Sequence, residues 1–291
     1  MKESLRAPRA AGMIERENQF RNADGLAIFY REWLSEAGGI RGLVFILHGI
    51  NEHSGRYRHV AAALTKAGLA CYGIDHRGHG LSGGTRGYIP DLQRAVDDVE
   101  QLVRLVRAEM PGLPPFIFAH SMGSLIGLGF VLRRPANLRG IALSGVAIHG
   151  DRNLPGWLAA LLQLAARIVP KFRLSPRGPA DVLTRDEGKL REWRDDPLVE
   201  KRMWRIGTSA AMLRMARYIC ASARSIEPPL LAMHGGADRL TPASGAHFLA
   251  ENAGASDVSI KIYPGLRHEL VNEIERDEII SFLRDWLLER V

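Results

Sequence analysis

The stretch PFIFAHSMGS, residues 115–124, decides the fold of this chain. Its apolar run PFIF is typical of a buried strand, and the residues from 122 onward continue as the helical pattern MGSLIGLGFVL. Ser121 lies at the turn between them, with Ala119 two residues before it and Gly123 two residues after it. Small residues at these positions permit a sharp strand-to-helix turn that presents a serine nucleophile. A serine that only caps the following helix is the alternative at this point.

Short apolar runs alternate with helical patterns along most of the chain. A hairpin is predicted in NQFRNADGLAIFYREWL, because Asn22, Asp24 and Gly25 are turn residues between two alternating segments. Further strands are predicted at GLVFILHG, LACYGID, PFIFAH, LRGIALSG, PLLAMHGG and VSIKIYPG. The final helix is expected to begin at Asn272, with Glu275 three residues later completing a capping box. Alternating strands and helices imply an α/β fold, a mainly parallel central sheet with helices on both faces.

The alternation stops between about residues 150 and 225, where the composition becomes helical, basic and rich in tryptophan. We therefore predict that residues 14–149 and 226–291 form one core. Residues 150–225 are expected to form a helical cap inserted after the sixth strand. Residues 1–13 are expected to be a disordered tail.

The composition is that of a packed, water-soluble protein, with 46% hydrophobic and 24% charged residues. A net charge of +7 suits an anionic surface such as phospholipid headgroups, but no nucleic-acid motif accompanies it, so nucleic-acid binding is not predicted. Cys71 and Cys220 are isolated, which is compatible with a reducing compartment. No signal peptide or membrane span is predicted, and we expect a cytoplasmic protein that could associate peripherally with membranes.

A serine nucleophile requires a base, and His268 is the predicted one. In parallel α/β sheets ligands gather at the carboxyl ends of the strands, and the triad order of this fold class is nucleophile, acid, histidine. Only His247 and His268 follow both Ser121 and the acid candidate described below. His247 lies within a helical pattern, whereas His268 lies on a loop after the last predicted strand.

Asp238 is the predicted acid that holds the imidazole in the right tautomer. It follows the strand PLLAMHGG on a loop that contains glycine. Asp257 and Glu269 are the alternatives, but Asp257 begins a strand and Glu269 adjoins His268 too closely.

An oxyanion hole requires two backbone N–H groups aimed at the developing negative charge. One is expected from Met122, directly after the nucleophile, and the other from the loop after VFILHG. We expect Ile50 to supply the second donor, with Asn51 as the less favoured choice.

Two other kinds of site find little support in the sequence. Asp75, His76 and His79 in DHRGHG could suggest a metal site, but no further ligand type joins them, so a loop held by Asp75 and Arg77 is predicted instead. The glycines of MGSLIGLG resemble a dinucleotide fingerprint only loosely, because they lie inside the helical pattern. Neither a metal nor an organic cofactor is predicted.

The segment LPGWLAALLQLAARIVPKF, residues 154–172, is apolar over most of its circumference. It is too short to span a bilayer. One interpretation is a helix buried in the cap, and the other is a lid that contacts lipid or lines an acyl tunnel. On the second interpretation Trp157, Leu158 and Leu161 bind the lipid substrate or the lipid surface.

Several motifs together resemble one known family. HGINEHSGRY, DHRGHGLSGG, HSMGS, HGGADRLTP and GLRHELVNE are similar to the serine α/β-hydrolases of the monoacylglycerol lipase and lysophospholipase family, over about residues 40–150 and 226–291. The resemblance implies a triad of Ser121, Asp238 and His268 with Ile50 and Met122 as oxyanion donors. It also implies that Glu52 and Arg56 organise the polar end of the substrate pocket, although a salt bridge that stabilises the loop is the simpler role. The sequence departs from the family pattern at Ala119, Ser124 and Asn51.

These inferences combine into one expected activity. We expect a cap-bearing α/β-hydrolase that cleaves single-chain carboxylic esters through an acyl-enzyme, with monoacylglycerol as the first choice of substrate. Lysophospholipids and short-chain esters are the alternatives. A perhydrolase or acyltransferase on the same scaffold is a further alternative, since nothing in the sequence separates water from another acyl acceptor.

Overall fold

The computed structural model describes residues 12–133, 137–148, 155–173, 180–202 and 204–291. The tail predicted for residues 1–13 falls outside the described part except at its end, where Met13 already begins a strand. The predicted boundary between core and cap near residue 150 also lies outside the described residues.

Within these residues, eight strands form one sheet in the order β1-β2-β4-β3-β5-β6-β7-β8. The pairs β1–β2 and β2–β4 are antiparallel, and the other neighbours are parallel. This confirms the predicted mainly parallel sheet with a hairpin at its edge. The strands are β1 Met13–Arg21, β2 Ala27–Ser35, β3 Gly42–Leu47, β4 Leu69–Ile74, β5 Pro115–His120, β6 Gly140–Ser144, β7 Leu230–Gly235 and β8 Val258–Tyr263.

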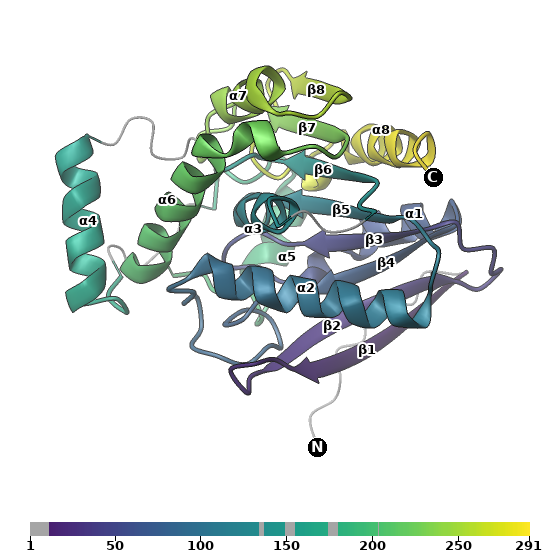
Figure 1. Cartoon of the computed structure of the whole chain (residues 1–291), viewed down its shortest axis with the longest axis horizontal. Helices are drawn as coiled ribbons and strands as arrows, with labels where there is room; N and C mark the ends of the chain where they lie inside the picture. Colours follow the sequence, from purple (N-terminus) through teal and green to yellow (C-terminus); the bar gives the residue numbers. More distant parts are fainter. Residues whose placement is uncertain (1–11, 134–136, 149–154, 174–179, 203) are drawn as a thin grey trace.

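Helices cover both faces of the sheet (Figure 1). Strand β3 shows why: Phe45 and Leu47 belong to one buried cluster and Val44 and Ile46 to the other, because successive side chains of a strand point to opposite faces. The first face is covered by α2 Leu92–Glu109, α3 Met122–Val131 and α7 Ser244–Asn252, and the second by α1 Arg58–Lys66 and α8 Arg276–Leu288. Short 3-10 turns occupy η1 Ser54–Tyr57, η2 Ala223–Ser225 and η3 Leu270–Asn272.

Between β6 and β7 the described residues contain three α-helices. They are α4 Gly156–Ile168, α5 Glu187–Asp195 and α6 Ile206–Ala221. Helix α6 packs against α2 and α3 and contributes Ile219 to the first core cluster. Helix α4 packs on α6 and stands at the edge of the molecule, away from the sheet (Figure 1). One helix of the cap therefore joins the core, while another is carried outside it.

Helix α4 is the apolar segment that the sequence singles out. It has 13 residues, fewer than the roughly 20 that a bilayer-spanning helix requires. No other helix in the described part of the chain has the length and apolar character needed to cross a membrane.

The predicted start of the last helix is wrong. Helix α8 begins at Arg276, and Asn272 lies in η3, where its side chain donates a hydrogen bond to Glu269 Oε2 at 2.9 Å. Glu275 makes no capping hydrogen bond and pairs with Arg185 of the cap. One local partner, Glu269, and one distant partner, Arg185, thus replace the expected capping contacts.

Candidate active site

Ser121 lies at the junction of β5 and α3 in a strained backbone conformation. Its φ of 51° and ψ of −119° are rare for a residue with a side chain. The turn packs so closely on β3 that a Cβ at Gly123 would lie 2.2 Å from Leu47 O. The side chain of Ser121 makes no helix-capping hydrogen bond, which argues against the capping alternative. The sharp strand-to-helix turn expected from the sequence is therefore present.

Ser124, one of the departures from the family pattern, helps to hold this turn. Its Oγ donates to Ser121 O at 2.6 Å and accepts from Ala147 N at 3.1 Å. The Ser121 N–H donates in turn to Ser144 O at 2.9 Å. Both contacts tie the nucleophile turn to the end of β6 and the loop that follows it.

The fold brings Ser121, His268 and Asp238 together from distant parts of the chain. His268 Nε2 lies 2.9 Å from Ser121 Oγ, and His268 Nδ1 lies 2.7 Å from Asp238 Oδ2. When Nδ1–H donates to the carboxylate, Nε2 carries the lone pair that can accept the hydroxyl proton. Of the alternatives, His247 is exposed on α7, Asp257 pairs with Arg290, and Glu269 pairs with Arg56.

The carboxylate of Asp238 is buried and fully hydrogen-bonded. Burial raises the pKa of this carboxyl group, but hydrogen bonds, chiefly from His234 and His268, lower it by more in total. The net pKa lies well below the ordinary range of an aspartate, so the group stays ionised. Thr241 donates to it through its hydroxyl at 2.9 Å and its N–H at 3.0 Å. Sequence reasoning missed Thr241, although an acceptor side chain that bonds the backbone two or three residues later is a common local pattern. Sequence reasoning also missed His234, which lies four residues before Asp238 with its Nε2 3.2 Å from Asp238 Oδ2.

Ile50 and Met122 carry backbone N–H groups that donate to no protein group within the described residues. The Gly49–Ile50 peptide is held by His48, whose Nε2 accepts from His76 N at 2.9 Å, so that its Nδ1 donates to Gly49 O at 2.6 Å. In a trans peptide the C=O and N–H point in opposite directions, so this contact turns the Ile50 N–H away from His48. Both N–H groups are therefore candidate donors for an oxyanion hole.

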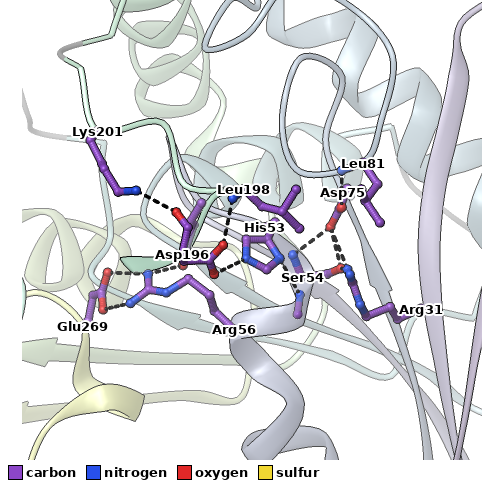
Figure 2. A network of polar contacts seen from close by, with 12 residues as sticks. Arg31, His53, Ser54, Arg56, Asp75, Leu81, Asp196, Leu198, Lys201 and Glu269 are labelled. Atoms are coloured by element: carbon purple, nitrogen blue, oxygen red, sulfur yellow. Dashed lines mark hydrogen bonds and ion pairs between the residues drawn. The ribbon is translucent and has the colours of Figure 1, made fainter. Parts of the chain in front are cut away.

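Arg56 lies between two buried carboxylates, Glu52 and Glu269. Its guanidinium donates to Glu52 at 2.7 Å and bidentately to Glu269 at 2.8 and 2.7 Å, the second pair being visible in Figure 2. Burial raises the pKa of each carboxyl group, but the charge of Arg56 together with nearby hydrogen bonds and histidines lowers it by more in total, so both are ionised. Glu52 Oε1 also accepts from Gly49 N at 2.6 Å and from Tyr57 Oη at 2.7 Å. These contacts favour the loop-stabilising role for Glu52 and Arg56.

A cavity of about 260 Å³ opens beside Ser121. Its polar wall is formed by Glu52, His120, His268 and Glu269. Its apolar wall comes mainly from the cap and includes Leu162, Leu183, Trp193, Trp204, Met212, Leu213 and Leu240. The site therefore joins the candidate nucleophile and the candidate oxyanion donors to an apolar chamber with one polar end.

The three cap residues predicted to bind the substrate do not line this cavity. Trp157 and Leu161 lie on the outer side of α4, with 70% and 51% of their surface exposed, and Leu158 is half-buried. Leu162 of the same helix lines the cavity instead. Helix α4 thus presents apolar side chains both inward and outward.

Buried histidines lie under the polar end of the site. Neither ring nitrogen of His76 has a hydrogen-bond partner in the described part of the chain. The ring centroid of His76 lies 4.4 Å from that of His48. The neighbouring Asp75 accepts hydrogen bonds from Ser54 N and Leu81 N, both at 2.8 Å. This confirms that Asp75 holds the loop. Among the described residues no three His, Cys, Asp or Glu side chains are arranged to hold a metal ion.

Comparison with known proteins identifies the family. The profile of a family described as serine aminopeptidase S33 matches residues 38–275. The monoacylglycerol lipase of Mycolicibacterium smegmatis is 33% identical over 94% of this chain and 96% of its own length. The human monoglyceride lipase is 30% identical over 92% and 89%. The chain therefore belongs to this family of serine hydrolases, the α/β-hydrolases of the monoacylglycerol lipase type, as the motifs predict.

Solved structures agree with this assignment. The crystal structure of the Paleococcus ferrophilus monoacylglycerol lipase superposes with a TM-score of 0.80 at 27% identity, covering 91% of this chain and 99% of that one. A soluble variant of the Saccharomyces cerevisiae monoglyceride lipase, at 22% identity and a TM-score of 0.83, shares the fold over 96% of this chain and 95% of that one. The predicted α/β-hydrolase fold is thereby confirmed.

Gly123→Ala should strongly destabilise the protein. Its new Cβ would meet the backbone carbonyl of Leu47, which cannot move without disturbing β3. We expect a loss of about 3 kcal/mol or more in the free energy of unfolding, measured by urea denaturation. Gly127→Ala is the matched control on the same helix, since its Cβ would meet only side-chain atoms at 3.3 Å or beyond. Equal stability of the two variants would contradict a tightly packed turn.

The buried histidines should make the fold sensitive to acid. Burial lowers the pKa of His79 to about 3 and of His120 to about 4, and it also lowers those of His48 and His76. In the unfolded chain these groups bind protons near pH 6.5, so stability present above that pH is lost progressively as the pH falls. Each unit of lowered pKa corresponds to about 1.4 kcal/mol.

We expect the melting temperature to fall by about 5 °C or more between pH 7 and pH 5, measured by calorimetry. His247→Gln, which replaces an exposed histidine of α7, is the control and should keep the wild-type profile. A melting temperature that stays constant over this pH range would contradict the interpretation.

Proposed function

We propose that this protein hydrolyses monoacylglycerols through an acyl-enzyme formed on Ser121. The observation that carries the proposal is the hydrogen-bonded chain Ser121–His268–Asp238 at the polar end of an apolar cavity. The names of the relatives, monoacylglycerol and monoglyceride lipases, support the choice of substrate. A single acyl chain suits the apolar wall, and an uncharged glycerol moiety suits a polar end where two carboxylates are already neutralised in part by Arg56.

In the first half of the reaction, Ser121 Oγ attacks the ester carbonyl while His268 Nε2 takes its proton. The tetrahedral intermediate carries its negative charge on the former carbonyl oxygen, where the N–H groups of Ile50 and Met122 would stabilise it. Asp238 stabilises the imidazolium through Nδ1–H. When the C–O bond to glycerol breaks, His268 gives its proton to the leaving alkoxide, and the acyl group remains on Ser121.

In the second half, water replaces glycerol. His268 takes a proton from the water as its oxygen attacks the acyl carbonyl, and the same two N–H groups stabilise the second intermediate. Collapse of this intermediate breaks the bond to Ser121 Oγ, which recovers its proton from His268. The fatty acid leaves and the resting enzyme is restored.

The outer face of α4 supports a further part of the proposal, contact with a lipid surface. Trp157, Leu161, Leu164 and Ile168 are spaced by four, three and four residues, so they form one stripe on the helix. Each is at least half exposed, and Phe172 extends the stripe beyond the helix end. Large apolar side chains gathered outside the core mark an interaction surface, and the net charge of +7 suits one that is anionic.

Ser121→Ala tests the proposed chemistry. We expect the rate of 1-oleoylglycerol hydrolysis to fall by about 10⁴-fold or more, because no acyl-enzyme can form without the Ser121 hydroxyl. Fatty acid release is measured by titration, and covalent labelling by a fluorophosphonate should be lost in parallel. Ser281→Ala on α8 is the control. Turnover at the wild-type rate in the Ser121 variant would overturn the mechanism.

The substrate is tested with a panel of esters. It compares monoacylglycerol with triacylglycerol, lysophosphatidylcholine, a p-nitrophenyl ester and an aminoacyl anilide, the last because the family description names a peptidase. Monoacylglycerol should give the highest kcat/KM. A higher kcat/KM for lysophosphatidylcholine or the anilide would contradict the proposed substrate class without contradicting the Ser121 chemistry.

The lipid-surface role is tested by the triple substitution Trp157→Gln, Leu161→Gln and Ile168→Gln. We expect association with vesicles of phosphatidylcholine and phosphatidylglycerol to fall about tenfold or more, because three large apolar groups no longer enter the interface. Activity on micellar monoacylglycerol should fall with it, while activity on a dissolved short-chain ester should persist. Ile274→Gln is the matched control, since Ile274 is 62% exposed outside the cap. Unchanged sedimentation with vesicles would exclude this role for α4.

A further inference from the structure

The oxyanion loop, residues 48–52, is fixed on its inner side by the core. Glu52 Oε1 accepts from Gly49 N, and His48 donates to Gly49 O, both at 2.6 Å. These contacts fix the orientation of the Gly49–Ile50 peptide, which carries the Ile50 N–H. They leave the outer side of the loop, at Asn51, to be held by another part of the chain.

The cap holds that outer side through Asn51. Asn51 O accepts from Glu200 N at 2.9 Å, and Asn51 Nδ2 donates to Arg202 O at 2.9 Å. Asn51 is buried and has a φ of 66°, a conformation that glycine adopts freely and that most other residues avoid. A glycine here would satisfy the backbone but could not reach Arg202. The amide side chain therefore adds a contact between cap and loop that the backbone conformation alone does not require.

The cap segment in contact with Asn51 has its own attachment to the core. Asp196, just after α5, accepts from His53 Nε2 at 2.7 Å, a contact seen at the centre of Figure 2. His53 Nδ1 accepts from Gly55 N, so the neutral ring carries its proton on Nε2 and donates it to Asp196. Lys201 Nζ donates to Asp196 O and Leu198 N to Asp196 Oδ1, both at 2.8 Å. The segment 196–202, which we call the cap clasp, is thus seated on residues 51–53 as one ordered turn.

We propose that Asn51 is a positioning residue through which the cap clasp sets the geometry of the oxyanion hole. The proposal rests on the proposed function, because it assigns the Ile50 N–H to the oxyanion. That N–H belongs to the residue directly before Asn51, so a shift of the clasp moves the donor. Transition-state stabilisation by a fixed donor is steeply sensitive to such displacement, whereas binding of the ground-state ester depends mainly on the apolar wall. Hydrolysis is therefore coupled to the seating of the cap.

Asn51→Gly removes the contact with Arg202 and keeps the backbone conformation. On dissolved p-nitrophenyl butyrate we expect kcat to fall about tenfold with KM within about twofold, since the donor is displaced rather than removed. Inhibition by an alkyl trifluoromethyl ketone, which forms an oxyanion when Ser121 adds to it, should weaken by about the same factor. Asp196→Ala, which releases the clasp from His53, should change both quantities in the same direction. The melting temperature is recorded for each variant.

Gln163→Ala is the matched control, because Gln163 joins α4 to α6 through Ala210 O and Arg214 without touching the loop. It should leave kcat and ketone inhibition unchanged. The proposal is overturned if Asn51→Gly and Asp196→Ala keep the wild-type ketone inhibition constant. It is also overturned if Gln163→Ala weakens inhibition as much, since the effect would then be a general loosening of the cap. Ser121→Ala reports separately on the proposed function, so failure of either idea can be recognised.

Discussion

The close approach of α3 to the end of β3 is the constraint on which the rest of the site depends. Gly123 lies so near Leu47 O that no side chain fits between them. The same packing accompanies the strained turn at Ser121, which lies beside the loop that follows β3. The candidate nucleophile is therefore positioned by the packing of one helix terminus on one strand end, and the loop that carries Ile50 is held in addition by His48 and Glu52. Strain of this kind persists because the surrounding hydrogen bonds, such as those of Ser124, over-determine the conformation.

A second layer of order comes from buried charge. Arg56 joins Glu52, which shapes the oxyanion loop, to Glu269, which follows the catalytic histidine candidate in the chain. Removing charges from water is costly, and a buried pair rarely adds much net stability compared with apolar packing. Its value here is geometric, because the bidentate contact fixes the distance between two loops that come from opposite ends of the sequence. Asp75, directly after β4, similarly links three segments, because it accepts from Arg31 of β2 and from the Ser54 N–H (Figure 2).

Most of the sheet could be predicted because it is written in local patterns, and the candidate triad followed from the chain order typical of this fold class. The strand-to-helix turn at Ser121, the alternation of apolar runs, and the position of His268 after the last strand each need only a few neighbouring residues. Of the residues that sequence reasoning missed, Thr241 and His234 lie within four residues of Asp238, whereas His120 reaches the cavity only because β5 is central in the sheet. The capping pattern at Asn272 failed because Asn272 bonds to Glu269, three residues earlier, and Glu275 pairs with the distant Arg185. The direction in which Trp157 points depends on how α4 lies on α6, which no periodicity specifies.

Helix α4 has apolar side chains on opposite sides, Leu162 facing the chamber and Trp157 facing outward. On the proposed docking, the hydrocarbon of a bilayer and the interior of the enzyme are separated by the width of a single helix. A fatty chain that passes beside α4 moves from one apolar environment to another. It avoids transfer into bulk water, which costs about 0.8 kcal/mol for each methylene group. Transfer of so insoluble a substrate through water would otherwise limit the enzyme. The two apolar sides of one short helix remove this limit.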